Sequence, residues 1–366
     1  MIVSGFTQEN SGIGRAGRLS IAGLSAIGLS PKPHDLRPLL SDATFGSEFL
    51  DTESEGGVWL IHCNPEEAIT AASRIRRTNW QNRFRIGYWA YELPRAPKSW
   101  LKLANFFHEI WVPSTFVAES LRGIKRPVVV MPHFSVMPPA TDPEKFRNRL
   151  GIGESTFVVG AAGDFLSSLT RKNLIGAVHA FLGAFPEPAP DRVRLIVKIR
   201  NREASEAAYT TLSRAVAGRA DIIILDKNLS DGDVSAFVAA LNVFLSPHRS
   251  EGYGLMLAEA LSMDIPVLAT GWSGNMEYMT GIHDALIPFK LSRVEDENGV
   301  YLANGDEHWA DPDVQIASEK LLRIFENEAI ARKICHLGRA NLNASNDAWA
   351  LNRISQMNWY PLASRS

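Results

Sequence analysis

The stretch from residue 243 to residue 263 limits the possible folds of this chain more than any other. It begins with the apolar run Val243–Leu245, which predicts a buried parallel strand. Pro247 ends that strand, and Gly252 and Gly254 permit a tight turn where backbone can approach a ligand closely. Residues 255–263 then show the apolar spacing of a helix. This order of strand, glycine loop and helix predicts a parallel α/β sheet with a ligand at the loop.

A helix that begins directly after glycines attracts anions, because its free N–H groups and its dipole point at the loop. Two carboxylates, Glu251 and Glu259, bracket the loop and its helix. Carboxylates accept hydrogen bonds from hydroxyl groups rather than binding phosphate. Phosphate and hydroxyl recognition at one strand end together suit a nucleotide-sugar. The alternative is a solvated helix face with an incidental pair of acids.

Strand-like and helix-like stretches alternate on both sides of this loop. In the first part, strands are expected at 2–6, near 36–40, and at 57–64, 84–94, 109–114 and 128–131, with helices at 15–27, 65–78, 97–107 and 115–121. In the second part, further strands are expected at 157–165, 194–200, 221–226, 266–270 and 285–289, with helices at 171–185, 312–327 and 329–342. Such alternation predicts doubly wound parallel sheets.

A proline-rich linker over residues 132–143 separates the two sets of elements, and 366 residues are enough for two domains. We therefore expect two Rossmann-like doubly wound domains, residues 1–140 and 141–345, facing each other across a cleft.

The composition is that of an ordinary globular protein, with 45% apolar and 21% charged residues. A net charge of −2 gives no drive toward nucleic acid. Cys63 and Cys335 lie far apart, match no metal-binding spacing and suit a reducing compartment. No signal-peptide pattern or membrane-spanning apolar run is visible, so we expect a cytoplasmic protein.

The motif at residues 250–255, with Glu259 eight residues after Glu251, resembles the donor site of the retaining family 4 glycosyltransferases when residues 266–275 follow it. The resemblance implies the GT-B architecture, in which the first domain binds the acceptor, the second binds the nucleotide-sugar, and the tail, residues 346–366, crosses back to the first domain. It implies a retaining hexosyltransferase that needs no metal or other cofactor. It also implies that Glu251 orients the transferred sugar and that Glu259 accepts hydrogen bonds from the ribose. The backbone of four neighbouring residues is expected to hold the diphosphate: Gly252, Tyr253, Gly254 and Leu255.

Residues 164–173 resemble a second element of the donor site in this family. Lys172 matches the lysine that grips the diphosphate, whereas Asp164 stands where many relatives have arginine. Arg171 could supply the missing charge, because a guanidinium binds a diphosphate in bidentate fashion. We therefore expect Lys172 and Arg171 to act with Glu251 in catalysis.

The base of the donor is expected over the strand ends near Lys198 and Asn228. Lys198 or Arg200 could contact O6 and N7 of guanine, and Asp226 its N–H groups. The same segments look most like family members that build bacterial surface polysaccharides, several of which are mannosyltransferases. GDP-mannose is therefore the favoured donor, and a UDP-sugar is the alternative.

The N-terminal part contains Gly12, Gly14 and Gly17 in the spacing G-x-G-x-x-G. A dinucleotide fingerprint needs its first glycine next to the strand and an acid after the second strand. Residues 7–11 intervene here, and the candidate acid Asp35 follows two prolines in a segment that resembles a loop. We expect Gly12 and Gly14 instead to form a mobile loop, before the helix at 15–27, that meets the donor phosphate or the acceptor. Two alternatives stay open, an NAD-dependent oxidoreductase and an inactive sugar-binding protein on the same fold.

Glu92 is a further catalytic candidate, because it closes the strand expected at 84–94 just before a proline. In many relatives a histidine near this position contacts the transferred sugar, but residues 88–94 contain none. Residues 71–130 carry an excess of eight positive charges, which suits a lipid-linked acceptor or the inner face of an anionic membrane. The alternative is a solvated surface. Aromatic residues are not interleaved as a single-stranded nucleic acid would require.

Overall fold

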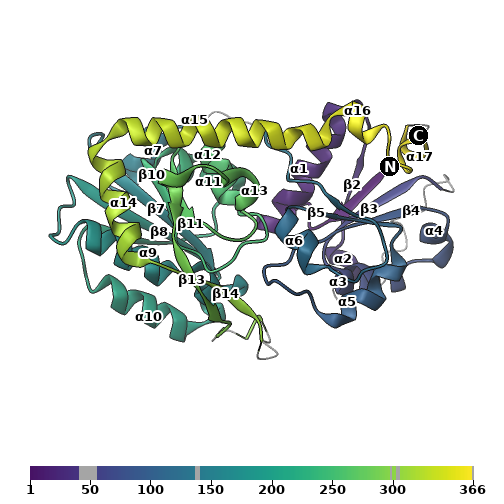
Figure 1. Ribbon diagram of the computed structural model, residues 1–366, viewed down its shortest axis with the longest axis horizontal. Helices are drawn as coiled ribbons and strands as arrows, with labels where there is room; N and C mark the ends of the chain where they lie inside the picture. Colours follow the sequence, from purple (N-terminus) through teal and green to yellow (C-terminus); the bar gives the residue numbers. More distant parts are fainter. Residues whose placement is uncertain (41–55, 137–140, 297–298, 302–305, 365–366) are drawn as a thin grey trace. The chain divides into compact units, whose positions relative to one another are not determined.

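The computed structural model describes residues 1–40, 56–136, 141–296, 299–301 and 306–364. The chain divides into two compact units (Figure 1). The N-terminal unit comprises residues 1–136 together with 343–366, and the C-terminal unit comprises residues 137–342. Part of the expected linker, Pro138 and Pro139, lies outside the described residues. No helix of the described chain is long and apolar enough to cross a membrane.

The N-terminal unit contains a six-stranded sheet in the order β2-β1-β3-β4-β5-β6, with every neighbouring pair parallel. Its strands are β1 (Ile2–Gly5), β2 (Lys32–Asp35), β3 (Val58–His62), β4 (Phe84–Tyr88), β5 (Glu109–Val112) and β6 (Val128–Val130). The helices between them are α1 (Gly12–Ala26), α2 (Arg37–Leu40), α3 (Pro65–Ser73), α4 (Arg77–Gln81), α5 (Lys98–Leu103) and α6 (Thr115–Ser120).

Three expectations for this unit are wrong in detail. Residues 37–40 form α2 rather than a strand, and the second strand comes earlier, at β2, despite Pro33. Proline is tolerated there because β2 is the edge strand and pairs only with β1. Asp35 therefore ends a strand instead of lying in a loop. The strand β4 ends at Tyr88, so Glu92 lies in the following loop.

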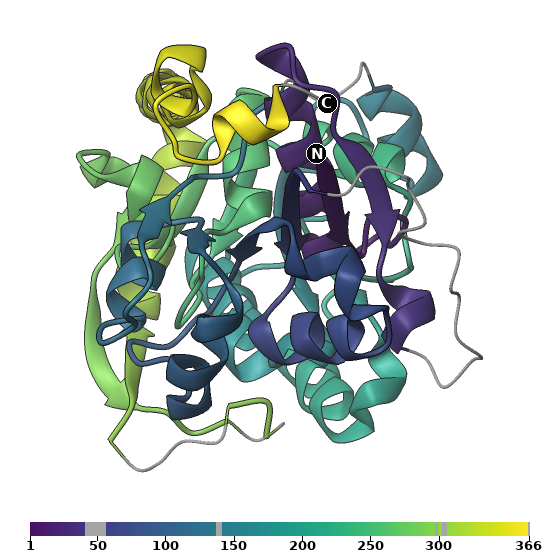
Figure 2. The same ribbon diagram turned by 90° about the vertical axis from the view of Figure 1, so that its right-hand side faces the viewer.

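The tail completes the core of the N-terminal unit. Trp349 and Trp359 are buried against Trp111 of β5. The ring centroid of Trp111 lies 5.9 Å from that of Trp349 and 5.7 Å from that of Trp359. The indole Nε1 of Trp349 also donates to the carbonyl of Pro132 at 2.7 Å. The tail carries the short helices α16 (Leu351–Ile354) and α17 (Tyr360–Ala363). Figure 2, with this unit toward the viewer, shows them in yellow on the same unit as the purple first residues.

The C-terminal unit contains a second parallel sheet, in the order β12-β11-β10-β7-β8-β9. Its strands are β7 (Phe157–Asp164), β8 (Val193–Arg200), β9 (Ile222–Asp226), β10 (Val243–Ser246), β11 (Val267–Thr270) and β12 (Leu286–Ile287). The helices are α7 (Pro143–Arg149), α8 (Leu169–Lys172), α9 (Leu174–Ala184), α10 (Glu206–Val216), α11 (Asp231–Ala239), α12 (Leu255–Ser262), α13 (Met276–Met279), α14 (Val314–Glu326) and α15 (Glu328–Ser345).

The two sheets confirm the expected fold class of two Rossmann-like doubly wound domains. In the second sheet the chain runs outward from β7 to β9 and then returns to β10 on the other side of β7. The carboxyl ends of β7 and β10 therefore flank the point where the strand order reverses, which is where α/β sheets bind ligands. The sequence analysis did not expect the helices α7, α10, α11 and α13. It also did not expect an antiparallel hairpin of β13 (Phe289–Arg293) and β14 (His308–Pro312).

Candidate functional site

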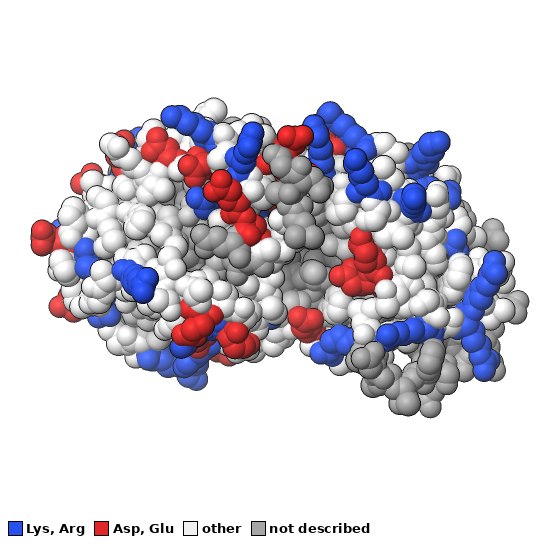
Figure 3. Space-filling model, turned by 90° about the horizontal axis from the view of Figure 1, so that it is seen from below, with Lys and Arg blue, Asp and Glu red and all other residues white. Residues whose placement is uncertain are grey.

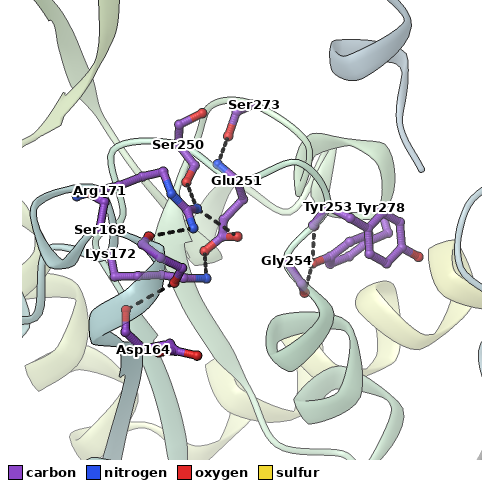
Figure 4. A network of polar contacts seen from close by, with 11 residues as sticks. Asp164, Ser168, Arg171, Lys172, Ser250, Glu251, Tyr253, Gly254, Ser273 and Tyr278 are labelled. Carbon is purple, nitrogen blue, oxygen red and sulfur yellow. Dashed lines mark hydrogen bonds and ion pairs between the residues drawn. The ribbon is translucent and has the colours of Figure 1, made fainter. Parts of the chain in front are cut away.

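The reversal point of the second sheet brings a basic pair against a carboxylate (Figure 4). Lys172 Nζ, from the segment after β7, lies 2.5 Å from Oε1 of Glu251 in the loop after β10. Nη1 of Arg171 lies 3.4 Å from Oε2 of the same carboxylate. Arg171 and Glu251 are buried, whereas the side chain of Lys172 is 24% exposed. Two loops from different strands are thus joined by one carboxylate and two cations.

These contacts decide the ionisation of Glu251. Burial alone would raise its pKa, but the Lys172 ammonium and the Arg171 guanidinium outweigh burial and lower the pKa to about 2. The backbone of Glu251 is also fixed, because its N–H donates to Oγ of Ser273 at 2.9 Å and its carbonyl accepts from Gly274 N at 2.8 Å. The residue is therefore an ionised, immobile hydrogen-bond acceptor.

The sequence predicted that the basic pair starts a long helix at 171–185, and this prediction is wrong. Arg171 and Lys172 form the last turn of α8, and Asn173 separates α8 from α9 with a left-handed φ of 52°. The Asn173 side chain caps α9 by accepting from Gly176 N at 3.1 Å, and its Nδ2 donates to the carbonyl of Pro247 at 2.8 Å. Asn173 therefore sets the direction of the basic pair and ties it to the loop after β10.

Arg171 and Lys172 differ in what they contact. The Arg171 guanidinium donates to the carbonyls of Ser250 at 2.8 Å and Ser167 at 3.1 Å, so it holds the two loops together from inside. Lys172 pairs with Glu251 through a side chain that stays partly exposed. Of the two residues predicted to grip a diphosphate, Lys172 is the more exposed, and Arg171 has the geometry of an internal anchor.

Asp164 organises the turn after β7. Its carboxylate accepts from Leu166 N at 3.0 Å and Asn201 Nδ2 at 2.7 Å, and it pairs with Nε of Arg200 at 3.0 Å. This ion pair engages Arg200, one of the two cations expected to contact the base. Lys198, the other, is buried in β8, and burial lowers its pKa, with a further decrease from Arg200.

The remaining residues expected to contact the base, Asp226 and Asn228, lie at and just after the exposed end of β9. In the sheet order, β8 lies between β7 and β9, so Lys198 near the end of β8 and Asp226 at the end of β9 belong to neighbouring strands. The structure places them at the carboxyl edge of the sheet that also carries Arg171 and Lys172.

The glycine loop delivers an uncapped helix start, as the sequence predicted. Gly254 has φ 84° and begins α12, whose first residue is Leu255 and whose N-terminus has no side-chain cap. A Cβ at Gly254 would lie 2.9 Å from Oη of Tyr278, which donates to the Gly254 carbonyl at 2.8 Å. Gly274 approaches so closely that a Cβ there would lie 2.0 Å from the carbonyl oxygen of Gly252. Only glycine fits these close backbone contacts.

Two predicted donor residues on this segment have buried side chains. Tyr253 is buried with its ring centroid 5.0 Å from that of Tyr278, so its side chain serves packing of the loop (Figure 4). Glu259 lies on α12, and its Oε1 accepts from Oγ of Ser235 on α11 at 3.1 Å. A hydroxyl group therefore already contacts the carboxylate that was predicted to recognise ribose hydroxyls.

His248 was missed by the sequence analysis. His248 lies in the loop after β10, and its side chain is fully buried. Its backbone carbonyl accepts from Oγ1 of Thr270 at 2.6 Å. Burial lowers the pKa of His248 to about 4, although the nearby Glu251 carboxylate opposes this effect. The imidazole is therefore neutral at physiological pH. Its place three residues before Glu251 was the available signal.

The other predicted site residues belong to the N-terminal unit. Helix α1 begins at Gly12, not at residue 15, because Ser11 Oγ caps it by accepting from Gly14 N at 3.2 Å. A Cβ at Gly14 would lie 2.3 Å from the Glu9 carbonyl, so this glycine serves packing of the preceding turn. Gly12 is exposed at the helix start, and Glu92 is half-buried.

The carboxylate of Asp35 has partners that bear on the dinucleotide alternative. It accepts from Gln8 N at 3.1 Å and from both Arg37 N and Arg37 Nε at 2.9 Å. An acid thus stands at the end of the second strand, as the fingerprint requires, but Arg37 and the preceding turn occupy its oxygens. The turn of residues 6–11 separates β1 from the glycines, which the fingerprint does not allow.

Residues 158–304 match the family Glycosyl transferases group 1. A D-inositol 3-phosphate glycosyltransferase from Stackebrandtia nassauensis is 28% identical over 163 residues. That match covers 42% of this chain and 37% of the relative, so the chain spans well under half of the length of this relative.

Two similar solved structures extend over the whole chain. A glycosyltransferase from Rickettsia africae has a TM-score of 0.67 at 12% identity and covers 100% of this chain and 98% of its own. HepE from Anabaena, in complex with UDP and glucose, has a TM-score of 0.64 at 13% identity and covers 99% of both chains. The protein therefore has the GT-B fold of two Rossmann-like doubly wound domains, and its C-terminal unit is similar to the family Glycosyl transferases group 1.

Proposed function

We propose that the protein is a retaining hexosyltransferase that moves a sugar from a nucleotide-sugar to a saccharide or lipid-linked acceptor. The observation that carries this proposal is the cluster of Glu251, Lys172 and Arg171 at the reversal point of the second sheet. The cluster lies within the residues that match the family Glycosyl transferases group 1. Cations, a fixed carboxylate and an uncapped helix start are together what a sugar diphosphate requires.

Each part of the site has a role in this reaction. The start of α12 and the exposed side of Lys172 would bind the diphosphate and stabilise the negative charge that develops as the sugar–phosphate bond breaks. Glu251 stays ionised because its pKa is about 2, so it can accept hydrogen bonds from sugar hydroxyls. Glu259 would accept from the ribose beside its present partner Ser235.

The donor nucleotide is the finer part of the proposal. The sequence pattern favours GDP-mannose, and a UDP-sugar is the alternative. The guanine contact with Arg200 is weakened because Asp164 pairs with this guanidinium, which leaves Lys198 as the base contact. Among the proteins of similar fold, HepE and the pneumococcal O-GlcNAc transferase GtfA were solved with UDP. A competition experiment decides: UDP binding at least tenfold tighter than GDP would contradict the guanine assignment.

The acceptor is proposed to approach the N-terminal unit. Exposed basic side chains lie on α4, on α5 and on the turn after α6, and Figure 3 shows Lys and Arg on one face of this unit. On α5, Leu101 is 43% exposed between Lys98 and Lys102. This combination suits an anionic membrane surface or a lipid-linked pyrophosphate. Co-sedimentation with vesicles, with and without anionic phospholipid, tests it.

The central test is a donor screen that measures nucleoside diphosphate release from UDP-, GDP- and ADP-sugars. Turnover with one donor that disappears in Lys172→Ala would support a transferase. Binding without turnover in the presence of saccharide and lipid-linked acceptors would favour an inactive sugar-binding protein. Enhanced NADH fluorescence on mixing, with no nucleotide-sugar binding, would favour the oxidoreductase alternative.

A further inference from the structure

The unexpected hairpin of β13 and β14 contacts both loops that form the candidate site. The segment after β13 reaches the turn before α8, where Oδ1 of Asp296 accepts from Oγ of Ser168 at 2.6 Å. Tyr301, whose N–H donates to Oδ2 of Asp296 at 3.0 Å, places its ring 5.9 Å from the Arg171 guanidinium. On the other loop, the carbonyl of Arg249 accepts from Ala310 N at 3.0 Å. The hairpin is thus packed onto the segments that carry the basic pair and Glu251.

Ser168 is the point where this contact acts. It is fully buried and has φ 61°, a conformation that a residue with a Cβ seldom adopts. Its Oγ accepts from Arg171 N at 3.2 Å and thereby caps α8. A serine hydroxyl has one hydrogen. Because that hydrogen is directed at Asp296, the lone pairs of Oγ face the Arg171 N–H.

A chain of contacts therefore runs from the hairpin to the site. Asp296 orients the hydroxyl of Ser168, the hydroxyl caps α8, and the last turn of α8 carries Arg171 and Lys172 to Glu251. The helix α8 has only four residues, so its own backbone bonds are few. Its geometry depends on the partners at its ends, Ser168 at the start and Asn173 at the finish.

We propose that Asp296 is a positioning residue for the donor diphosphate, which acts through Ser168 on the direction of Lys172. This inference rests on the proposed function, because it concerns how the same site holds a nucleoside diphosphate. Electrostatics alone predicts the opposite sign. An extra carboxylate repels a diphosphate, so its removal would tighten binding if Asp296 acted only as a charge. If Asp296 positions the basic pair, its removal weakens binding.

The experiment measures calorimetric affinities for UDP, UMP, GDP and GMP. We expect Asp296→Ala to lower the affinity for the preferred diphosphate about tenfold, the scale of one lost hydrogen bond to a charged group. The matching monophosphate should change less than twofold. Asp296→Asn keeps an oxygen acceptor for Ser168 and should recover most of the affinity. The matched control is Glu295→Ala, which removes the same charge from the exposed neighbouring residue.

Ser168→Ala gives a second, independent route to the same contact. It should weaken diphosphate binding as Asp296→Ala does, and the double variant should be no weaker than Ser168→Ala alone, because both remove one interaction. Unchanged or tighter diphosphate binding in Asp296→Ala would overturn the positioning role, and so would equal losses for monophosphate and diphosphate. If the unmodified protein bound neither diphosphate, the proposed function itself would fall together with this inference.

Discussion

The buried ion cluster at Glu251 makes the stability of the C-terminal unit depend on pH in a defined direction. The pKa of this carboxyl falls from about 4.5 in the unfolded chain to about 2 in the folded protein, because Lys172 and Arg171 outweigh burial. A group with a depressed folded pKa stabilises the protein above its unfolded pKa, and the stabilisation is lost as the pH falls through the folded pKa. The window of change is therefore pH 5 to 2.

The magnitude follows from the shift. About 2.5 pKa units correspond to about 3 kcal/mol at pH 7, of which about 2 kcal/mol is lost by pH 3. The perturbation is Glu251→Gln, which removes the ionisable group and leaves Lys172 and Arg171 in place. The quantity compared is the difference in free energy of unfolding between the parent and Glu251→Gln. We expect this difference to be about 2 kcal/mol smaller at pH 3 than at pH 7.

The assay is urea unfolding at pH 7, 5, 4 and 3, followed by far-ultraviolet circular dichroism and fitted with one transition for each unit. Glu154→Gln, which alters an exposed carboxylate of the same unit, is the control and should show no such trend. A difference between the parent and Glu251→Gln that stayed constant from pH 7 to pH 3 would refute the reasoning. It would mean that the two cations do not hold the carboxylate ionised.

Three further predictions concern binding, backbone strain and the tail. Glu259→Ala should weaken nucleotide binding by about 1–3 kcal/mol, the cost of unpaired buried polar groups, whereas Glu251→Ala should abolish transfer and leave calorimetric nucleotide affinity nearly intact. Gly254→Ala should destabilise the C-terminal unit by about 1–3 kcal/mol in urea unfolding, because φ there is 84° and the new Cβ would meet Tyr278. Trp359→Ala should destabilise the N-terminal unit by about 3–5 kcal/mol, because it empties a fully buried site.

Each of these has a result that would contradict it. Equal nucleotide affinities in Glu259→Ala and the parent would remove the ribose role. Tyr278→Phe in the Gly254→Ala background should relieve only the steric part, so full recovery would mean that φ contributes nothing. If thermal melting of the N-terminal unit were the same in Trp359→Ala and the parent, the tail would not belong to its core.

The fold could be predicted from the sequence wherever apolar runs and glycine turns coincide. The strand β10, the turn at Gly254 and the start of α12 follow from the local chain, because a buried strand, a left-handed turn and a helix leave a periodic pattern. The strand β2 was missed because two of its four residues are exposed at the sheet edge and none is fully buried, and because Pro33 is tolerated there. Edge position is a tertiary property with no local signal.

The site could be predicted only in part for a similar reason. Glu251 and Lys172 were found from their motifs, and no motif indicates that Asn173 splits the helix, since a left-handed asparagine depends on its bond to Pro247. Ser168 and Asp296 are 128 positions apart in the chain, and only the hairpin brings them together. His248 carries no helical or strand periodicity, and its burial comes from packing between loops.

The return of the tail to the first unit has a consequence for how the chain is made. The C-terminal unit is one uninterrupted segment, 137–342, inserted into a unit whose last pieces are synthesised after it. During translation the C-terminal unit can complete its core first. The core of the N-terminal unit stays incomplete until Trp349 and Trp359 have been synthesised. The chain leaves the N-terminal unit after residue 136 and returns at residue 343, and hydrogen bonds join the two places. Ser135 N donates to Asn346 Oδ1 at 2.8 Å, and Asn346 Nδ2 donates to Ser135 O at 3.0 Å. A short loop from Ser135 to Asn346 would therefore join the two pieces of the N-terminal unit into one continuous polypeptide without the C-terminal unit.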